Sequence, residues 1–310
     1  MQASPPSATA GAGLKDWLSL VSLGLIWGAS FMAVSIATTG LGPLSIAGGR
    51  IGLGALVLFG LARVMGLSLP GWSGPDGARI WTSALGLGFF SMVLPFFLLG
   101  WGQARVPSGF AGVTMAMSPL LTLVLAHFFV VGEPMTGRKT IGMLIGFAGV
   151  VVLIGGDVFA SSGADGESLA RLACAGAAAS YAVGAIVTRR APASDPIGFA
   201  TIATLLAAAM IVPLALLVEG LPRAPGVAPV LAIVFLGLIP TALANLLLVA
   251  IIRSAGPSFV SLVNYQVPVW SVLFGWAFLG ELLPARVFAA LALILTGVAI
   301  SQFNRRRALG

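Results

Sequence analysis

Polar side chains that could bind a small molecule form a stripe within the apolar segment 257–280. They recur at steps of three and four residues, which places them on one face of a helix. In lipid, a polar stripe is expected to face a partner helix or an internal cavity. We therefore assign Asn264, with the flanking Tyr265 and Gln266, as candidate substrate-binding residues. The stripe consists of Ser261, Asn264, Pro268, Ser271 and Gly275.

Aromatic and hydroxyl side chains in other apolar segments extend this candidate site. Rings suit an apolar or aromatic part of a solute, while hydroxyl and amide groups suit its polar ends. Phe90 and Phe97 are expected on one face, because their spacing is two helical turns. For each candidate, packing between helices or against lipid is the alternative to a binding role. The further candidates are Trp27, Ser30, Phe90, Phe97, Thr114, Ser118, Tyr181 and Asn245.

Acidic residues are few, and none lies in the middle of an apolar segment. A carboxylate within the membrane marks a cation site or a proton relay, so this distribution disfavours a dedicated pump for cationic drugs. Mid-segment lysines are also lacking, which disfavours phosphorylated sugars and nucleotide sugars as substrates. Glu133 and Glu281 are expected to fix loops at helix ends. A neutral, aromatic cavity remains, and it suits a zwitterion or another amphipathic solute. The acidic residues are Asp16, Asp76, Glu133, Asp157, Asp165, Glu167, Asp195, Glu219 and Glu281.

The chain has one histidine, His127, and one cysteine, Cys174. Without a buried carboxylate they cannot assemble a metal site or a catalytic triad, so we expect no metal and no cofactor. An intramembrane enzyme is thereby disfavoured, and the lack of a P-loop pattern disfavours ATP-driven pumping. His127 could carry a proton at physiological pH, or it could make a polar contact at the inner end of its segment. Downhill, facilitated transport is favoured over proton antiport.

The elements that would position these residues follow from composition. Of the 310 residues, 58% are hydrophobic and 8% are charged, whereas soluble domains carry about 25% charged residues. Long apolar segments predict membrane-spanning helices, because the backbone must be hydrogen-bonded internally in lipid. The sequence therefore predicts an all-α membrane protein with ten transmembrane helices. Their predicted ranges are 17–40, 44–65, 79–101, 107–131, 138–158, 169–188, 197–218, 226–252, 257–280 and 284–303.

Basic residues are distributed unevenly between the connections. With the N-terminus in the cytoplasm, eleven Lys and Arg side chains fall inside and four outside, while Arg50, near the outer end of its segment, counts for neither side. The positive-inside rule then places both termini in the cytoplasm. This bias also explains the net charge of +7 without nucleic-acid binding. Residues 1–14 are expected to form a disordered tail and residues 304–310 a basic cytoplasmic tail.

A pattern of Arg, Pro, Gly-Glu, Arg and Gly occurs twice, at a spacing of 148 or, for the prolines, 149 residues. Each half of the chain, 15–158 and 159–303, holds five apolar segments, so the second half must cross the membrane in the opposite sense. The result is an inverted repeat, whose two near-equivalent packings support alternating access. The first copy is Arg105, Pro119, Gly132, Glu133, Arg138 and Gly149, and the second is Arg253, Pro268, Gly280, Glu281, Arg286 and Gly297.

These motifs resemble those of the drug/metabolite transporter superfamily, in particular its ten-helix EamA family. The resemblance rests on Trp27-Gly28-Ala29-Ser30-Phe31, on Gly132-Glu133-Pro134 and on Gly280-Glu281, with a proline inside the fourth and ninth segments. It covers about residues 15–303. It implies an inner-membrane carrier, usually an exporter of amino acids or related metabolites. The chain is also similar to the YddG-type aromatic amino acid exporters.

We therefore expect a facilitated exporter of aromatic or other apolar amino acids, working by alternating access in the lipid bilayer as a monomer or a weak homodimer. A proton-coupled exporter of other metabolites or amphipathic drugs is the alternative, followed by a channel or an intramembrane enzyme. Glycine pairs such as Gly142 and Gly146 are expected to bring helices close together, within the monomer or between protomers.

Overall fold

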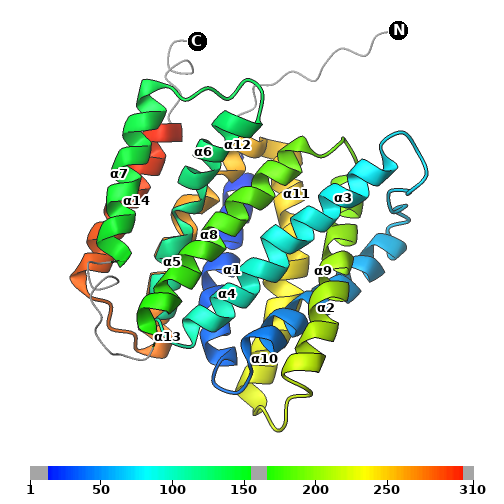
Figure 1. Cartoon of the computed structure of the whole chain (residues 1–310), viewed down its shortest axis with the longest axis horizontal. Helices are drawn as coiled ribbons and strands as arrows, with labels where there is room; N and C mark the ends of the chain where they lie inside the picture. Colours follow the sequence, from blue (N-terminus) through cyan, green and yellow to red (C-terminus); the bar gives the residue numbers. More distant parts are fainter. Residues whose placement is uncertain (1–12, 155–165, 303–310) are drawn as a thin grey trace.

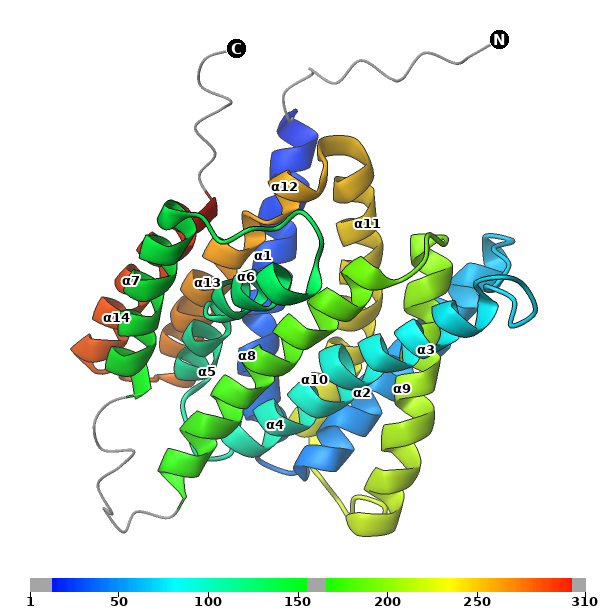
Figure 2. The same cartoon turned by 45° about the horizontal axis from the view of Figure 1, so that its top comes forward.

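The computed structural model describes residues 13–154 and 166–302, and every element in that part of the chain is helical. The helices form one bundle in which α1 begins and α14 ends at the same end (Figures 1 and 2). We call this end proximal and the opposite end, where α1 finishes, distal. The predicted tails lie outside the described residues, apart from Gly13 and Leu14.

The elements agree with the predicted all-helical membrane protein, and their ends lie close to those of the predicted segments, except for the predicted ends at 158 and 303, which lie outside the described residues. Seven helical stretches of the described chain are long and apolar enough to cross a membrane, and 285–301 is a shorter apolar helix. The number of ten spans stays a prediction. The bounds are α1 (Leu14–Ala37), α2 (Pro43–Val64), α3 (Gly77–Gly88), η1 (Phe89–Val93), α4 (Leu94–Gln103), α5 (Ser108–Met115), α6 (Ser118–Phe129), α7 (Gly137–Ile154), α8 (Glu167–Arg190), α9 (Pro196–Val218), α10 (Val227–Leu236), η3 (Gly237–Leu243), α11 (Ala244–Ala255), α12 (Pro257–Val260), α13 (Val263–Leu279) and α14 (Ala285–Gln302).

Two long stretches, 77–103 and 227–255, are interrupted by the π-helical turns η1 and η3. Pro95 follows η1 and Pro240 lies within η3. Because a proline has no N–H, it cannot complete the α-helical hydrogen-bond ladder, and a wider turn accommodates the missing bond. η1 and η3 begin at positions 89 and 237, which have the same spacing as the sequence pattern.

Four helix pairs contribute most to the packing: α1 with α13, α2 with α9, α4 with α8, and α7 with α14. Each pair joins a helix before position 155 to one after position 165. The α7–α14 pair lies at one edge of the bundle in both views (Figures 1 and 2). A Cβ atom added to Gly142 would lie 2.5 Å from the carbonyl oxygen of Gly297, so the two backbones approach directly. The close packing predicted for Gly142 is thus made within the chain.

Candidate functional site

A buried arginine, Arg50, marks the candidate site. It lies in the first half of α2, and only 7% of its surface is exposed. Arg50 lies close to the end of its predicted segment, so the sequence predicts no role for it. A charged side chain held inside an apolar bundle is costly, and such residues in membrane helices are usually functional. Arg50 is therefore the starting point for the site.

Arg50 is held by one hydrogen bond and one ring contact. Its Nε donates to the Thr241 hydroxyl oxygen at 2.9 Å, and its Cζ lies 3.7 Å from the centre of the Phe96 ring. The centroid of the Phe96 ring lies 6.5 Å from that of Tyr181. We call Arg50, Phe96, Tyr181 and Thr241 the Arg50 cluster. Its members belong to α2, α4, α8 and η3, so two come from each half of the chain.

The π turn η3 fixes Thr241 in this position. The Thr241 hydroxyl donates to the Leu236 carbonyl at 2.8 Å, a bond across five residues that fits the wider turn. The hydroxyl oxygen can still accept the bond from Arg50. α2 approaches closely, since a Cβ added to Gly54 would lie 2.5 Å from Thr241 Cγ2. A side chain at position 54 would therefore displace Thr241 from Arg50.

Within the described chain, no acidic side chain is a counter-ion for Arg50. Two of the nine acidic residues, Asp157 and Asp165, lie outside the described residues. Each of the others binds a different partner near a helix end. These partners are Ser254 for Asp16, Arg79 for Asp76, Lys139 and Arg189 for Glu133, Arg171 for Glu167, Arg253 for Asp195, and backbone N–H groups for Glu219 and Glu281.

Three residues predicted from the sequence lie in or beside the Arg50 cluster. Tyr181 is a member of it, and the Asn245 side-chain amide donates to the Thr241 carbonyl. Trp27 Nε1 donates to the carbonyl of Pro240 in η3 at 3.4 Å. These contacts tie α1 and α11 to the π turn that positions the cluster.

The π turn η1 contains Phe90, and Phe97 follows it in α4. The Ser180 hydroxyl donates to the carbonyl of Phe90, which lies in η1, at 2.7 Å. One extra residue in a turn rotates the following helix by about 100°, so α-helical spacing no longer sets a common face for Phe90 and Phe97. The ring that meets Arg50 belongs to Phe96, while Phe97 is a half-buried residue of α4.

The remaining predicted residues belong to α1, α5, α6 and α13, which supply no member of the cluster. The Ser30 and Thr114 hydroxyls donate to carbonyls in their own helices, at 2.6 Å and 2.9 Å. Gln266 packs on α1, since a Cβ added to Gly24 would lie 2.9 Å from its Oε1. Ser118, Asn264 and Tyr265 are half-buried residues of α6 and α13.

Packing between helices explains much of the polar stripe in α13. Ser271 is fully buried, and its hydroxyl donates to the Pro268 carbonyl at 2.8 Å. A Cβ added to Gly112 in α5 would overlap with the Ser271 hydroxyl, and one added to Gly28 in α1 would lie 3.2 Å from its backbone nitrogen. The stripe therefore lies where α13 meets α1 and α5.

Two carboxylates bind helix N-termini at the distal end of the bundle. Glu281 accepts the backbone N–H groups of Ser108 at 2.7 Å and Gly109 at 3.0 Å, in the first turn of α5. Glu219 makes the same pair of bonds to the first turn of α2, at 2.9 Å and 2.8 Å. A carboxylate in this place satisfies free N–H groups and interacts favourably with the helix dipole. Both contacts join a loop of the second half to a helix of the first.

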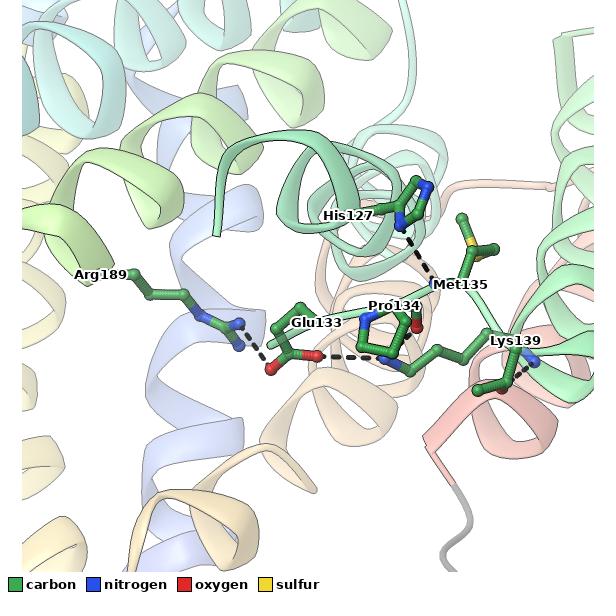
Figure 3. Close-up of polar contacts among 7 residues, drawn as sticks. His127, Glu133, Pro134, Met135, Lys139 and Arg189 are labelled. Carbon is green, nitrogen blue, oxygen red and sulfur yellow. Dashed lines mark hydrogen bonds and ion pairs between the residues drawn. The ribbon is translucent and has the colours of Figure 1, made fainter. Parts of the chain in front are cut away.

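At the proximal end, Glu133 lies between two cations (Figure 3). Its carboxylate oxygens are 3.0 Å from Lys139 Nζ and 3.3 Å from Arg189 Nη1. The hydrogen bond from Lys139 lowers the pKa of the Glu133 carboxyl, and the charge of Arg189 adds to this effect. Nearby, His127 Nδ1 accepts the N–H of Met135 at 3.1 Å. His127 thus makes a polar contact that orders the loop after α6.

Comparison with known proteins identifies the family. The profile of the EamA-like transporter family matches residues 16–155 and again residues 168–303. The chain belongs to this family. Members of the EamA family are transporters, and several helices of this chain are long and apolar enough to cross a membrane. The protein is therefore a membrane transporter. The resemblance inferred from the sequence motifs is confirmed.

Individual relatives cover nearly the whole EamA protein. The uncharacterized inner membrane transporter YedA of Escherichia coli (strain K12) is 26% identical over 290 residues, which are 93% of this chain and 90% of the relative. The probable terminal-alkyne amino-acid exporter of Streptantibioticus cattleyicolor is 26% identical over 306 residues, 93% of either chain. A solved crystal structure matches with a TM-score of 0.62 at 24% identity and covers 96% of this chain and 100% of that one. That likeness shows a shared fold.

Proposed function

We propose that the protein exports small amphipathic metabolites, first among them aromatic or other apolar amino acids, by alternating access without a coupling ion. The observation that carries this proposal is the composition of the Arg50 cluster. Arg50 and Phe96 come from the first half of the chain, and Tyr181 and Thr241 from the second. In transporters built from two repeats, the substrate site lies between the halves. A cation, two rings and a hydroxyl suit a solute with an apolar body and a polar end.

The proposed transport unit is one chain with ten spans in two inverted halves, 15–158 and 159–303. The two separate matches of the family profile and the equal spacing of η1 and η3 support this division. Both termini would lie in the cytoplasm and the chain in the inner membrane. The bias of basic residues supports the orientation, and the name of the Escherichia coli relative supports the membrane.

Amino acids are the first substrates to test for two reasons. One relative, at 26% identity, is named a probable terminal-alkyne amino-acid exporter. In addition, the aromatic rings beside Arg50 suit an apolar body, which a sugar phosphate lacks, and the positive charge of Arg50 disfavours a cationic drug. Among the described residues, the acidic side chains bind partners at helix ends, which favours facilitated transport over proton coupling.

Counterflow in proteoliposomes tests the proposal directly. Vesicles containing the purified protein are loaded with one unlabelled amino acid, and the same amino acid is added outside in radiolabelled form. The experiment is repeated for each member of a panel of twenty amino acids. We expect at least one apolar or aromatic member to be exchanged faster than in protein-free vesicles. A panel with no transported and no competing member would remove amino acids as substrates. Uphill accumulation driven by a pH gradient alone would replace the facilitated mechanism by proton coupling.

A further inference from the structure

We propose that Arg50 binds the carboxylate of the transported solute, so that the carrier requires an acid group on its substrate but no amine. This inference rests on the proposed function, because it takes the Arg50 cluster to lie on the transport path. It names the substrate class as small carboxylates with an apolar or aromatic body. The amine of an amino acid is then tolerated rather than recognised.

The buried charge of Arg50 favours a bound anion. Arg50 is more than nine-tenths buried, and removing a guanidinium from water is strongly unfavourable unless a counter-charge accompanies it. Each acidic residue that the structure describes binds another partner near a helix end. Charged residues within membrane helices typically pair with one another or with a ligand. A bound carboxylate would supply the charge that the described chain does not offer.

The hydrogen-bond donors of Arg50 favour a planar acceptor such as a carboxylate. A guanidinium carries five N–H donors in a planar fork, and a carboxylate matches two of them at once. The Nε–H group of Arg50 already donates to the Thr241 hydroxyl oxygen. In residues 13–154 and 166–302, the two terminal amino groups of Arg50 have no hydrogen-bond acceptor. Because Phe96 covers one face of the guanidinium, a planar acceptor would bind at its edge, where these donors lie.

The surroundings of Arg50 favour an apolar acid over a small inorganic anion. Tyr181 is close enough to interact electrostatically with Arg50, and its hydroxyl has no hydrogen-bond partner among the described residues. It can donate to the same carboxylate. The rings of Phe96 and Tyr181, 6.5 Å apart, form an aromatic wall for the body of the solute. Recognition of the amine would need a carboxylate or a set of acceptors that this cluster does not contain.

Four probes with one phenyl body separate the two ends of the solute. They are phenylalanine, its methyl ester, 3-phenylpropanoate and 2-phenylethylamine, each competing with the radiolabelled amino acid that counterflow identifies. Phenylalanine and 3-phenylpropanoate should compete at similar concentrations. The ester and the amine should need at least about 30-fold more, the effect expected when one partner of a buried charge pair is lost. Equal competition by the ester or the amine would overturn the role of Arg50 and leave the carrier function standing.

Two variants of α2 make the test specific for Arg50. Arg50→Gln should abolish the difference between acid and ester, whereas Arg63→Gln should keep it. Arg63 is the matched control, because it lies exposed in the last turn of the same helix, 5.9 Å from the Phe59 ring centre. In Arg50→Lys, which keeps the charge but lacks the planar fork, 3-phenylpropanoate should compete at concentrations between those found for the wild type and for Arg50→Gln. A variant at position 50 that keeps the wild-type preference for the acid over the ester would refute the proposal.

Thermal unfolding of the purified protein gives a readout that does not depend on transport. 3-Phenylpropanoate should raise the melting temperature of the wild type and of Arg63→Gln, but not that of Arg50→Gln. If no amino acid is transported, the proposed function fails, and this measurement judges the carboxylate site alone. Stabilisation of wild type and loss of it in Arg50→Gln would uphold the site. Lack of stabilisation in the wild type, or equal stabilisation of Arg50→Gln, would overturn it.

Discussion

Replacing Glu281 by glutamine should loosen the distal end of the bundle. The Glu281 carboxylate accepts two backbone N–H groups of α5, at 2.7 Å and 3.0 Å. A hydrogen bond to a charged group contributes about 1.5–3 kcal/mol, and glutamine keeps one acceptor oxygen but turns an NH₂ group towards the other donor. The contact should therefore weaken by about 1–3 kcal/mol, which shifts the balance between closed and open distal ends by about 5–150-fold.

Cysteine labelling measures this shift. Ser108→Cys places the reporter at the contact, because the Ser108 side chain is fully buried and its hydroxyl has no partner in the described chain. A membrane-impermeant maleimide should label this cysteine about 5–150-fold faster when Glu281→Gln is also present. The native Cys174 is fully buried and should add little background.

Asp76→Asn is the control for this experiment. Asp76 precedes α3 and pairs with Arg79 at 3.1 Å, and both side chains are more than half exposed. A surface pair of this kind contributes about 0–1 kcal/mol, so its loss should leave the labelling rate nearly unchanged. If Glu281→Gln does not accelerate labelling, or if Asp76→Asn accelerates it equally, the capping contact does not hold the distal end closed.

Three further substitutions test other contacts. Gly275→Ala should accelerate labelling as Glu281→Gln does, because the new Cβ would overlap with the Glu281 carboxylate; a normal rate would contradict this overlap. Glu133→Gln should lower the melting temperature at neutral pH by the loss of about 0.2–1 kcal/mol per ion pair. Because the pKa of Glu133 is lowered from 4.5, its carboxylate stabilises the fold above that pH, and the difference from wild type should vanish as the pH falls through the lowered value. A difference that persists in acid would exclude the charge as its cause. Gly142→Ala should destabilise the protein by about 1–3 kcal/mol, since its Cβ would lie 2.5 Å from the Gly297 carbonyl oxygen; an unchanged midpoint of thermal unfolding would be inconsistent with that contact.

The helices could be predicted from the sequence because hydropathy and length decide secondary structure in lipid. For example, the predicted segment 197–218 corresponds to α9, Pro196–Val218. The Arg50 cluster could not be predicted in the same way. Its members are far apart in the chain, and only the packing of α2, α4, α8 and η3 brings them together. A usable signal was nonetheless present: an arginine within an apolar segment, with no acidic residue at the same depth.

The arrangement of the rings shows a second limit of sequence periodicity. The spacing of Phe90 and Phe97 indicates one face only if the helix is α-helical throughout. Pro95 signals an irregularity nearby, but it does not say which turn widens or in which direction the following rings rotate. Tyr181, a candidate substrate-binding residue from the sequence, lies in the uninterrupted helix α8 with its ring centroid 6.5 Å from that of Phe96; its binding role stays a prediction.

Glu219 and Glu281 both belong to the second half of the chain, and both bind helix N-termini at the distal end through paired bonds to backbone N–H groups. The proximal carboxylate, Glu133, instead meets two cations at a partly exposed site. In the uniporter proposed above, contacts of unequal strength at the two ends cannot drive net flux, because the two directions must balance at equal concentrations. They would make the half-saturation concentration and the maximal rate differ between the two sides in the same proportion. Where opening of the more strongly held end of the empty carrier limits turnover, exchange of labelled solute should run faster than net efflux.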